Sequence, residues 1–461
     1  MAFHHGTETK RTDGGSSPVY DIDGAITALV GTAPIGAVND LIVCSTVKDF
    51  AQYSSLTDAG FTIPDAARIW TRYASGQCYV VNVCDPAKHR TTIASENLTV
   101  DAATLMATTA KPALIAGTYT VKDGATALVE NTAYTIDTVT GTIQFVTKPT
   151  APNIAYTYVD PSKVTEAEIL GGYVLASNAR TGLELVKEGF TRFGADAKVI
   201  IIPEYDKTAS CAAAMISTAL ATNAEAYISA PKGTSLSAAI SGRGSAGTIN
   251  FKSAEKPANY CYPYLKSGDR LEHKATHDAG LRMWVDVNQG YWWSISNHEY
   301  RGVTGVEFAL TSRPDDVQSE TNRLNAVGIT TVFNSFGTGF RAWGNRNASW
   351  PTNSHISNFA VAYRTGNFID EAIRRTEFKY TDRPVDAALL DAFLEEIRVY
   401  MSGCRAIVGF SVDLDRDYDL ADAYSKGQIP LMYEFTPKLP AERISNNSVM
   451  TRKFMVNLVK K

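Results

Sequence analysis

The sequence lacks any uninterrupted apolar run of about 18 residues or more, which excludes an ordinary membrane-spanning helix. It also lacks an excess of one charge, since 44 basic residues face 48 acidic ones and the net charge is −4. This balance gives the chain no bulk electrostatic reason to bind nucleic acid or an anionic membrane. Residues 1–15 contain no apolar segment of the secretory type, so we expect no export signal.

Cysteine is scarce, with six residues and no Cys-x-x-Cys pair among them. Scattered cysteines in a long chain are typical of reduced and mostly buried thiols in a cytoplasmic product. Cys78 and Cys84 fall on one predicted strand, where strand geometry separates them by roughly 20 Å, too far for a disulfide.

The length and composition of the chain indicate a folded protein of several domains. The chain has 461 residues, of which 44% are hydrophobic and 20% charged, and this length predicts about two to four domains. Buried strands alternate with helices, as in an α/β layer with a mixed, largely parallel sheet. Residues 179–193 are predicted to form one amphipathic helix. The other predicted elements are strands at residues 25–30, 41–44, 78–83, 198–202 and 226–229, and helices at 64–73 and 208–223.

Residues 97–160 differ in composition from their surroundings. They are rich in Thr, contain no Cys, Trp or Arg, and consist of short alternating runs separated by turn residues. Thr140 and Gly141 lie between two of these runs and favour a hairpin. We expect a small all-β domain here, inserted into the α/β layer.

The C-terminal part is predicted to be an α+β domain. A helix should begin at residues 382–384, present Val385, Leu389, Phe393, Ile397 and Met401 on one side, and end at Gly403. Strands are expected at residues 406–414 and 429–435, with an acidic loop between them. The expected division is an N-terminal arm at 1–24, an α/β core at 25–96 and 161–346, the inserted β domain at 97–160, the α+β domain at 347–449 and a C-terminal strand arm at 450–461.

A lone strand is predicted at the end of the chain, where Phe454, Val456 and Leu458 share one face. Such a strand needs a sheet to join, because its amides and its apolar face are otherwise left in water. It can fold back onto its own domain or add to the edge of a neighbour's sheet. The residues alone favour the first alternative.

Residues 324–349 are the most distinctive stretch of the sequence. Gly328 follows a predicted helix end at a position that tolerates positive φ, and residues 329–333 read as a buried strand. Two rings and two arginines then stand between glycines in residues 337–346, with no nucleophile, base or metal ligand among them. This composition suits a fixed structural junction or a partner surface.

This stretch resembles the tail sheath proteins of contractile-tailed bacteriophages. Members carry a helix ending in Asn-Ala-x-Gly-Ile/Val, here residues 325–329, then a short strand and a Gly-Phe-Arg-x-Trp-Gly-Asn-Arg loop. Ala342 stands where the family commonly has an aromatic residue, and residues 334–338 form a longer lead-in. Residues 433–437 and 457–459 also resemble the C-terminal module of the family. The loop residues here are Gly339, Phe340, Arg341, Trp343, Gly344, Asn345 and Arg346.

The resemblance covers residues 19–96 and 165–461, and it reverses the preference for fold-back. It implies that arms at both chain ends cross to neighbouring subunits and complete a sheet there, while the inserted domain is variable decoration. The implied arm residues are Val19, Tyr20, Ile22, Phe454, Val456 and Leu458, and the implied acceptor residues are Ile407, Val408, Phe410, Val412, Leu431, Tyr433 and Phe435.

The function that the resemblance implies is structural. Many copies would polymerise around a tail tube and contract to drive it through the bacterial envelope for genome ejection, with no cofactor and no catalysis. Implied partners are further copies, the inner tube protein, and baseplate and tail terminator proteins, but not nucleic acid or a stably occupied membrane. The subunit would assemble in the host bacterial cytoplasm and reside in the virion tail. The alternative is the sheath of a headless contractile particle, bacteriocin-like or secretion-like; a soluble α/β enzyme is more remote.

Three motifs suggest chemistry without supporting it. Ser235 sits in a Gly-Thr-Ser turn, but the subtilisin-like His5 precedes it and the Asp-His-Ser order is not met. Residues 242–247 match the letters of a dinucleotide fingerprint, but residues 248–251 read as a strand instead of the required helix. His273 and His277 have the spacing of a helical metal pair without a third ligand, so a solvated loop is expected.

Overall fold

The computed structural model describes residues 24–334 and 336–453. Its centre is a mixed eight-stranded sheet whose six inner strands run parallel and whose two edge strands run antiparallel to their neighbours. The predicted mixed, largely parallel sheet is therefore present. In spatial order the strands are β2 (Ile42–Cys44), β3 (Gln77–Asn82), β1 (Ile26–Gly31), β13 (Val199–Ile201), β14 (Glu225–Ser229), β15 (Ala258–Cys261), β19 (Ile329–Phe333) and β20 (Arg341–Trp343).

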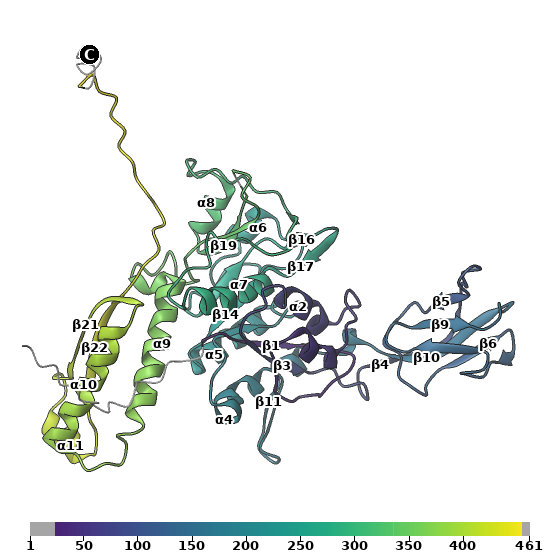
Figure 1. Ribbon diagram of the computed structural model, residues 1–461, viewed down its shortest axis with the longest axis horizontal. Helices are drawn as coiled ribbons and strands as arrows, with labels where there is room; N and C mark the ends of the chain where they lie inside the picture. Colours follow the sequence, from purple (N-terminus) through teal and green to yellow (C-terminus); the bar gives the residue numbers. More distant parts are fainter. Residues whose placement is uncertain (1–23, 335, 454–461) are drawn as a thin grey trace, which may run out of the picture.

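Helices cover both faces of this sheet (Figure 1). Successive strand residues point to opposite sides, so the strands present an apolar surface on each face, and each surface forms a core with the helices that cover it. In β1, Ala28 belongs to the apolar core on one side of the sheet, which α5 (Ala209–Ala221) and α6 (Leu236–Ser241) also line. Leu29 packs on the other side with α2 (Thr62–Trp70) and α7 (Lys274–Asn288). The six cysteines are free, and all but the half-buried Cys404 are buried, as the sequence predicted.

The single helix predicted over residues 179–193 is wrong. The segment instead forms β12 (Ala179–Thr181), a 3₁₀ helix (Gly182–Glu188) and the short α4 (Gly189–Phe193). Gly182 has a φ of +57°, outside the helical region, and a Cβ there would meet the carbonyl oxygens of Glu168 and Ile169 at 2.6 Å. Leu183 and Val186 are buried, as their apolar spacing suggested, but Gly182 turns the chain and prevents a continuous α-helix over the segment.

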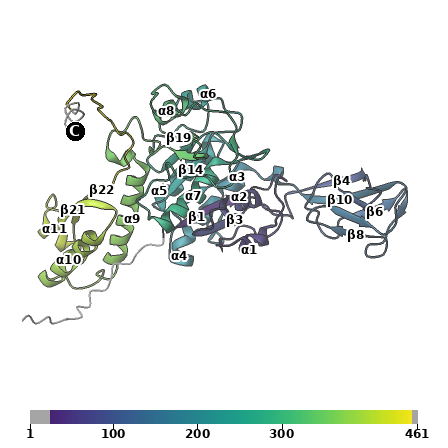
Figure 2. The same cartoon turned by 45° about the horizontal axis from the view of Figure 1, so that its top comes forward.

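A small β unit projects from the body and stays separate in both ribbon views (Figures 1 and 2). It has its own apolar core, which includes Val121, Ile143 and Tyr156. The hairpin predicted at Thr140–Gly141 is present, with Gly141 at a φ of +73°. Its strands are β4 (Arg90–Asn97), β10 (Pro152–Val159), β6 (Thr120–Asp123) and β7 (Thr126–Ala127) in one sheet, and β5 (Met106–Thr108), β9 (Thr142–Phe145) and β8 (Tyr134–Asp137) in another. The unit thus begins at β4, whereas the predicted start was residue 97.

The C-terminal part packs two helices on a two-stranded sheet. The elements are α9 (Ala360–Glu377), α10 (Ala387–Gly403), β21 (Ile407–Leu414), α11 (Leu420–Ser425) and β22 (Leu431–Pro437). The predicted helix start at residues 382–384 is wrong, because Asp386 is the N-cap and accepts a hydrogen bond from the Leu389 amide at 2.7 Å. Val385 therefore lies outside α10 and is exposed.

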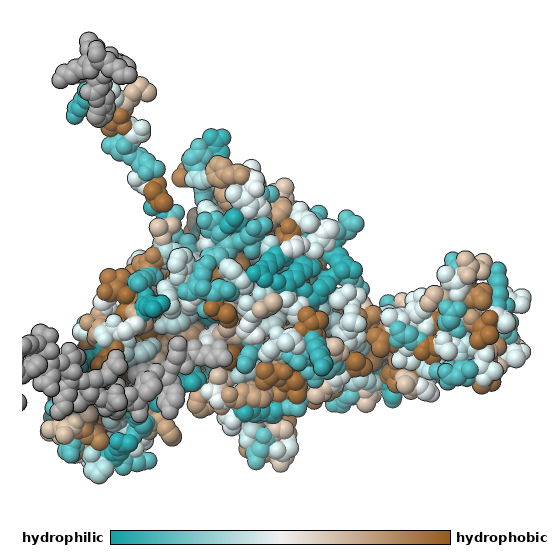
Figure 3. All heavy atoms as spheres, in the orientation of Figure 1, coloured by the Kyte–Doolittle hydropathy of each residue, from teal (hydrophilic) through white to brown (hydrophobic). Residues whose placement is uncertain are grey.

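After Pro437, the described chain contains no further helix or strand. Residues 438–453 leave the body as an extended thread (Figure 1), and the space-filling view shows much of it standing clear of other atoms (Figure 3). Ile444, Val449 and Met450 are exposed on this thread. We call residues 438–453 the tail segment.

Candidate functional site

The distinctive glycine-bounded loop, residues 339–346, is built into the edge of the central sheet. β20 pairs with β19, with Trp343 opposite Thr331 and Arg341 opposite Phe333. The rings of Trp343 and Phe333 stack with centroids 4.4 Å apart. The preceding Gly328 has a φ of +72°, as predicted. The loop is thus a structural junction among its described neighbours, and the predicted strand at residues 329–333 is confirmed.

Arg243 connects the segments on either side of this junction through hydrogen bonds to their backbone carbonyls. Its guanidinium donates to five carbonyl oxygens at 2.6 to 3.2 Å, and it stacks 4.7 Å from the ring centroid of Tyr260. Burial lowers the pKa of Arg243, but the carbonyls solvate the charge as water would. The accepting carbonyls belong to Val327, Phe251, Ser253, Ala348 and Trp350.

Arg243 lies inside the stretch whose letters match a dinucleotide fingerprint. The helix that such a site needs is absent, since residues 242–253 form turns and irregular chain. The strand expected at residues 248–251 is absent as well. Gly242 and Gly247 lie so close together that a Cβ on Gly247 would meet the Gly242 carbonyl oxygen at 1.9 Å. These glycines serve a tight turn around Arg243.

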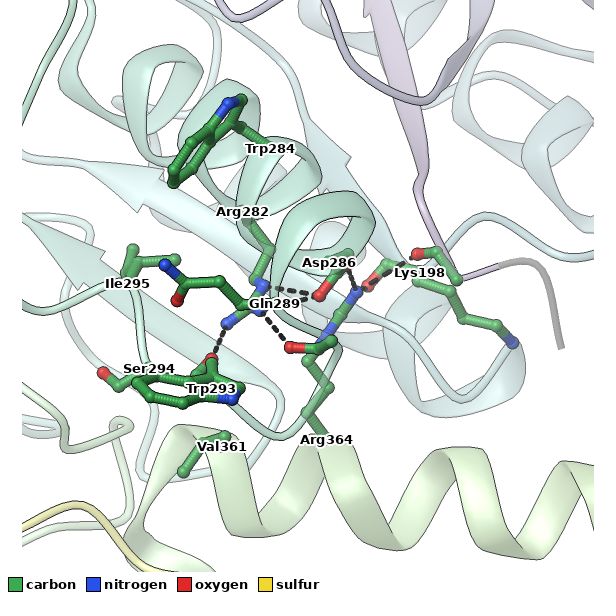
Figure 4. Close-up of polar contacts among 12 residues, drawn as sticks. Lys198, Arg282, Trp284, Asp286, Gln289, Trp293, Ser294, Ile295, Val361 and Arg364 are labelled. Carbon is green, nitrogen blue, oxygen red and sulfur yellow. Dashed lines mark hydrogen bonds and ion pairs between the residues drawn. The ribbon is translucent and has the colours of Figure 1, made fainter. Parts of the chain in front are cut away.

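A buried ionic network joins α9 to the central sheet (Figure 4). Arg364 on α9 donates to Glu225 at 2.8 Å and also to Asp286, which pairs in turn with Arg282 at 2.7 Å. Two turns further along α9, Glu371 pairs with Lys198. Burial acts to lower the pKa of Arg364, but Asp286 and Glu225 outweigh it and raise that pKa.

Between these ion pairs, Phe368 stacks on Tyr291 with ring centroids 4.2 Å apart. The opposite side of α9 carries Ile369 and Ile373, which pack against α10 and the C-terminal sheet. One helix therefore belongs to two cores, and it fixes the C-terminal part to the α/β body. Arg364 also donates to the carbonyl of Gly24 at 3.2 Å, where the described chain begins.

The expectation of a solvated loop at His273 and His277 is wrong. His273 caps α7, His277 lies within that helix, and both are buried. Gly280 also lies within this helix, where an added Cβ would meet the Tyr73 ring at 2.4 Å. His273 contacts Asp206 at 3.0 Å. Within residues 24–334 and 336–453, no group of three or more potential ligands is arranged to hold a metal ion.

Glu272 is the centre of the cluster around His277. Its carboxylate accepts hydrogen bonds from both terminal nitrogens of Arg72 at 2.7 and 2.8 Å, and it lies 2.9 Å from Nε2 of His277. Burial acts to raise the pKa of Glu272, but His277 and Arg72 outweigh it and lower the pKa from 4.5 to about 2. The ionised carboxylate therefore stabilises the fold fully above pH 4.5, and this contribution is lost as the pH falls toward 2.

We expect Glu272→Gln to lower the free energy of unfolding at neutral pH by about 3 kcal/mol, because the amide cannot neutralise Arg72. The variant should also lose stability less steeply than the parent between pH 4.5 and 2. Denaturant titrations at several pH values measure both effects. Glu255→Gln is the control, since Glu255 is exposed and forms no ion pair within the described chain. Equal losses from the two variants, or an unchanged acid slope in Glu272→Gln, would contradict the assignment.

Ser235 occupies the N-cap of α6, as expected for a strand-to-helix loop. Its hydroxyl accepts from the Ala238 amide at 3.3 Å and lies 3.2 Å from the Ser237 hydroxyl. His5, the other half of the subtilisin-like pattern, lies outside the described residues. The acidic loop also has a local role, since Asp419 caps α11 and Asp422 pairs with Lys426 at 2.7 Å.

The C-terminal sheet brings together all seven predicted acceptor residues. Phe410 lies opposite Phe435, Val412 opposite Tyr433, and Leu414 opposite Leu431. The last two pairs and Phe435 pack toward α9 and α10, whereas Phe410 is 37% exposed. Val408 falls at an irregularity in the pairing and is 74% exposed. Within the described chain, each strand pairs only with the other, so both outer edges of this sheet have unpaired backbone groups.

The predicted arm residues Val19, Tyr20, Ile22, Phe454, Val456 and Leu458 lie outside the described residues. Arg346, the last residue of the distinctive loop, reaches the tail segment. Its Nε lies 3.0 Å from Oε2 of Glu442, and its Nη2 donates to the same carboxylate. The guanidinium also lies 3.6 Å from the ring centroid of Phe359. Sequence reasoning missed this pair, because 96 residues separate its members.

No helix of the described chain is long and apolar enough to cross a membrane. The comparisons with known proteins agree with the architecture. A sequence model described as the phage tail sheath protein central domain matches residues 178–348. The tail sheath protein of Burkholderia phage BcepMu is 39% identical over 471 aligned positions, which cover 99% of this chain and 98% of the relative.

Two solved structures share the fold along nearly the whole chain. The contracted sheath complex of PVC, an extracellular contractile injection system, aligns with a TM-score of 0.59 and 12% identity, covering 98% of this chain and 99% of its own. The contracted helical sheath of the anti-feeding prophage aligns with a TM-score of 0.56 and 13% identity, covering 98% and 100%.

Proposed function

The chain belongs to the phage tail sheath protein family, and from this premise we propose how its parts build a contractile sheath. The protein is a structural subunit of such a sheath, and it assembles with copies of itself. The family is structural and not enzymatic. The mechanism must therefore come from contacts between subunits.

In the proposed assembly, strands at the chain ends join the C-terminal sheet of neighbouring subunits. One observation carries this proposal: the two-stranded sheet has open edges, while the tail segment is extended and exposes Ile444, Val449 and Met450. An added strand would satisfy the unpaired amides and carbonyls of an edge and would cover apolar side chains. The donors are residues Val19, Tyr20 and Ile22 and residues Phe454, Val456 and Leu458; the edges are those of β21 and β22.

Each proposed arm is bound to the body close to where it starts. Arg364 binds the carbonyl of Gly24, the first described residue after the N-terminal arm, and Arg346 binds Glu442 before the C-terminal arm. Because α9 fixes the C-terminal part to the body, a pull on either arm would move the subunit as a whole. Contraction then proceeds through repacking of linked subunits toward a more favourable interface, without nucleotide hydrolysis.

We further propose that the sheath surrounds an inner tube protein and meets baseplate and tail terminator proteins at its ends. The extended sheath would be assembled in the host bacterial cytoplasm. In a phage, contraction would drive the tube through the bacterial envelope for genome ejection. A headless particle is the second candidate, supported by the structural likeness to PVC and the anti-feeding prophage. The division into domains at residues 24, 160, 346 and 449 remains part of this proposal, with the start of the projecting β unit moved from residue 97 to β4.

The purified full-length protein is expected to form long hollow tubes in negative-stain electron microscopy. Truncation after Ser448 should abolish them, because the truncated chain lacks the strand that would join a neighbour. Circular dichroism and a thermal melt establish that the truncated chain remains folded. Tubes from both proteins would retain the sheath function but refute the C-terminal link. Folded, monodisperse particles from both would refute polymerisation by this chain alone.

A further inference from the structure

The tail segment is held to the body at a single point beyond its root. Lys438 donates its amide to the carbonyl of Ala406 at 2.9 Å, which continues the end of the C-terminal sheet. Beyond that residue, the hydrogen bonds and ion pair that tie the described tail to the rest of the described chain all run between Glu442 and Arg346. We call this pair the tail anchor.

Arg346 is organised to receive the tail. Its guanidinium lies 3.6 Å from the ring centroid of Phe359 and 4.5 Å from that of Trp350, and it also donates to the side-chain oxygen of Asn358. These contacts fix the plane of the guanidinium before the carboxylate arrives. Two nitrogens then face the two oxygens of Glu442, in the geometry that suits a carboxylate.

The remainder of the contact is loose. A cavity of about 360 Å³ lies where Pro440, Ala441 and Glu442 pass the distinctive loop and Trp350. The tail is therefore not seated in a packed groove at this point. The side chains of Arg346 and Glu442 are 19% and 30% exposed, and a partly exposed ion pair is a modest interaction that water can replace. The anchor can hold the tail and can also release it.

We propose that the tail anchor sets the length of tail available to reach a neighbouring subunit. With the anchor closed, the free tail begins after Glu442; with it open, the free tail begins after Lys438, whose amide still binds Ala406, and gains residues 439–442. Extended chain spans at most about 3.3–3.6 Å per residue, so release adds at most roughly 14 Å of reach. This inference rests on the function proposed above, in which the C-terminal arm joins a neighbour.

A suppressor experiment tests this inference directly. Deletion of residues 444–447 shortens the free tail by roughly 13 Å, and it should raise the critical concentration for polymerisation about tenfold or more, because the arm no longer spans the gap between subunits. Adding Glu442→Ala to the deletion opens the anchor and returns residues 439–442 to the free tail, which matches the four residues deleted. The double variant should polymerise within about twofold of the parent concentration. Pelleting and light scattering over a concentration series measure these values.

Arg443→Ala in the same deletion background is the matched control. Arg443 is exposed, adjoins Glu442 and forms no ion pair within the described chain, so its loss should restore nothing. The inference is overturned if the deletion polymerises like the parent, or if Glu442→Ala leaves the deletion as defective as before. Normal polymerisation after truncation at Ser448 would instead refute the C-terminal arm itself, and the inference with it. Truncation that abolishes tubes, together with a failed suppressor, refutes the anchor alone.

Discussion

Replacing Arg364 by Met is expected to lower the free energy of unfolding by about 3–5 kcal/mol, the cost of breaking a buried ion pair by removing one partner. The substitution preserves much of the side-chain volume but leaves Glu225 without its ion-pair partner and Asp286 with only Arg282. Each of the four side chains is at most 3% exposed, so water cannot substitute for the missing guanidinium. Denaturant titration followed by circular dichroism measures the loss.

A second substitution separates the unpaired charge from lost packing. Adding Glu225→Gln to Arg364→Met removes the uncompensated carboxylate. In the parent protein Asn259 donates a hydrogen bond to Glu225 at 3.1 Å, and the amide oxygen of the glutamine can still accept it. The double variant should therefore be more stable than Arg364→Met alone, by a positive coupling between neighbouring sites. A double variant that is as unstable as the sum of the two single ones would show that packing, and not charge, accounts for the loss.

Replacing Arg243 by Met should have an effect of similar size, about 3–5 kcal/mol, because a hub of buried carbonyl oxygens loses its donors. Phe251 and Ser253 have other donors, from Gly244 and Tyr260, but the variant removes the Arg243 donors from Val327, Ala348 and Trp350. Denaturant titration reports the total loss. Amide hydrogen exchange should reveal faster local opening of β19, which begins two residues after Val327.

Arg313→Met is the matched control for this variant. Arg313 is exposed and pairs only locally, with Asp315 at 2.8 Å, so its loss should leave the denaturation midpoint unchanged. Unchanged exchange in β19 together with a stable Arg243→Met protein would show that the five hydrogen bonds are not what secures the junction.

The sequence was most informative where burial follows from apolar runs. β1 and β19 were predicted to within one residue, because strands covered on both faces by helices need apolar side chains at nearly every position. The hairpin at Gly141 and the turn at Gly328 were equally accessible, since a positive φ favours glycine. These features depend on local chemistry alone.

The sequence was least informative where charge is buried. The spacing of apolar residues did not predict α9, because three of its buried positions hold Arg364, Asn367 and Glu371 in place of apolar residues. Their partners come from distant parts of the chain; Glu225, for example, is 139 residues from Arg364. The same reason explains His277, whose burial depends on Glu272 and on Tyr73, 204 residues away. A polar residue reads as exposed until its tertiary partner is known.

The pairing of β4 with β10 has a practical consequence. Arg90 lies opposite Val159, so the chain leaves the body and returns to it on adjacent antiparallel strands. The projecting β unit hangs from this two-strand stem and keeps its own core. Any domain whose own ends lie equally close could be exchanged for it without altering the path of the chain through the body. A polymer of such subunits would be a display scaffold that carries one grafted cargo per subunit at a regular spacing.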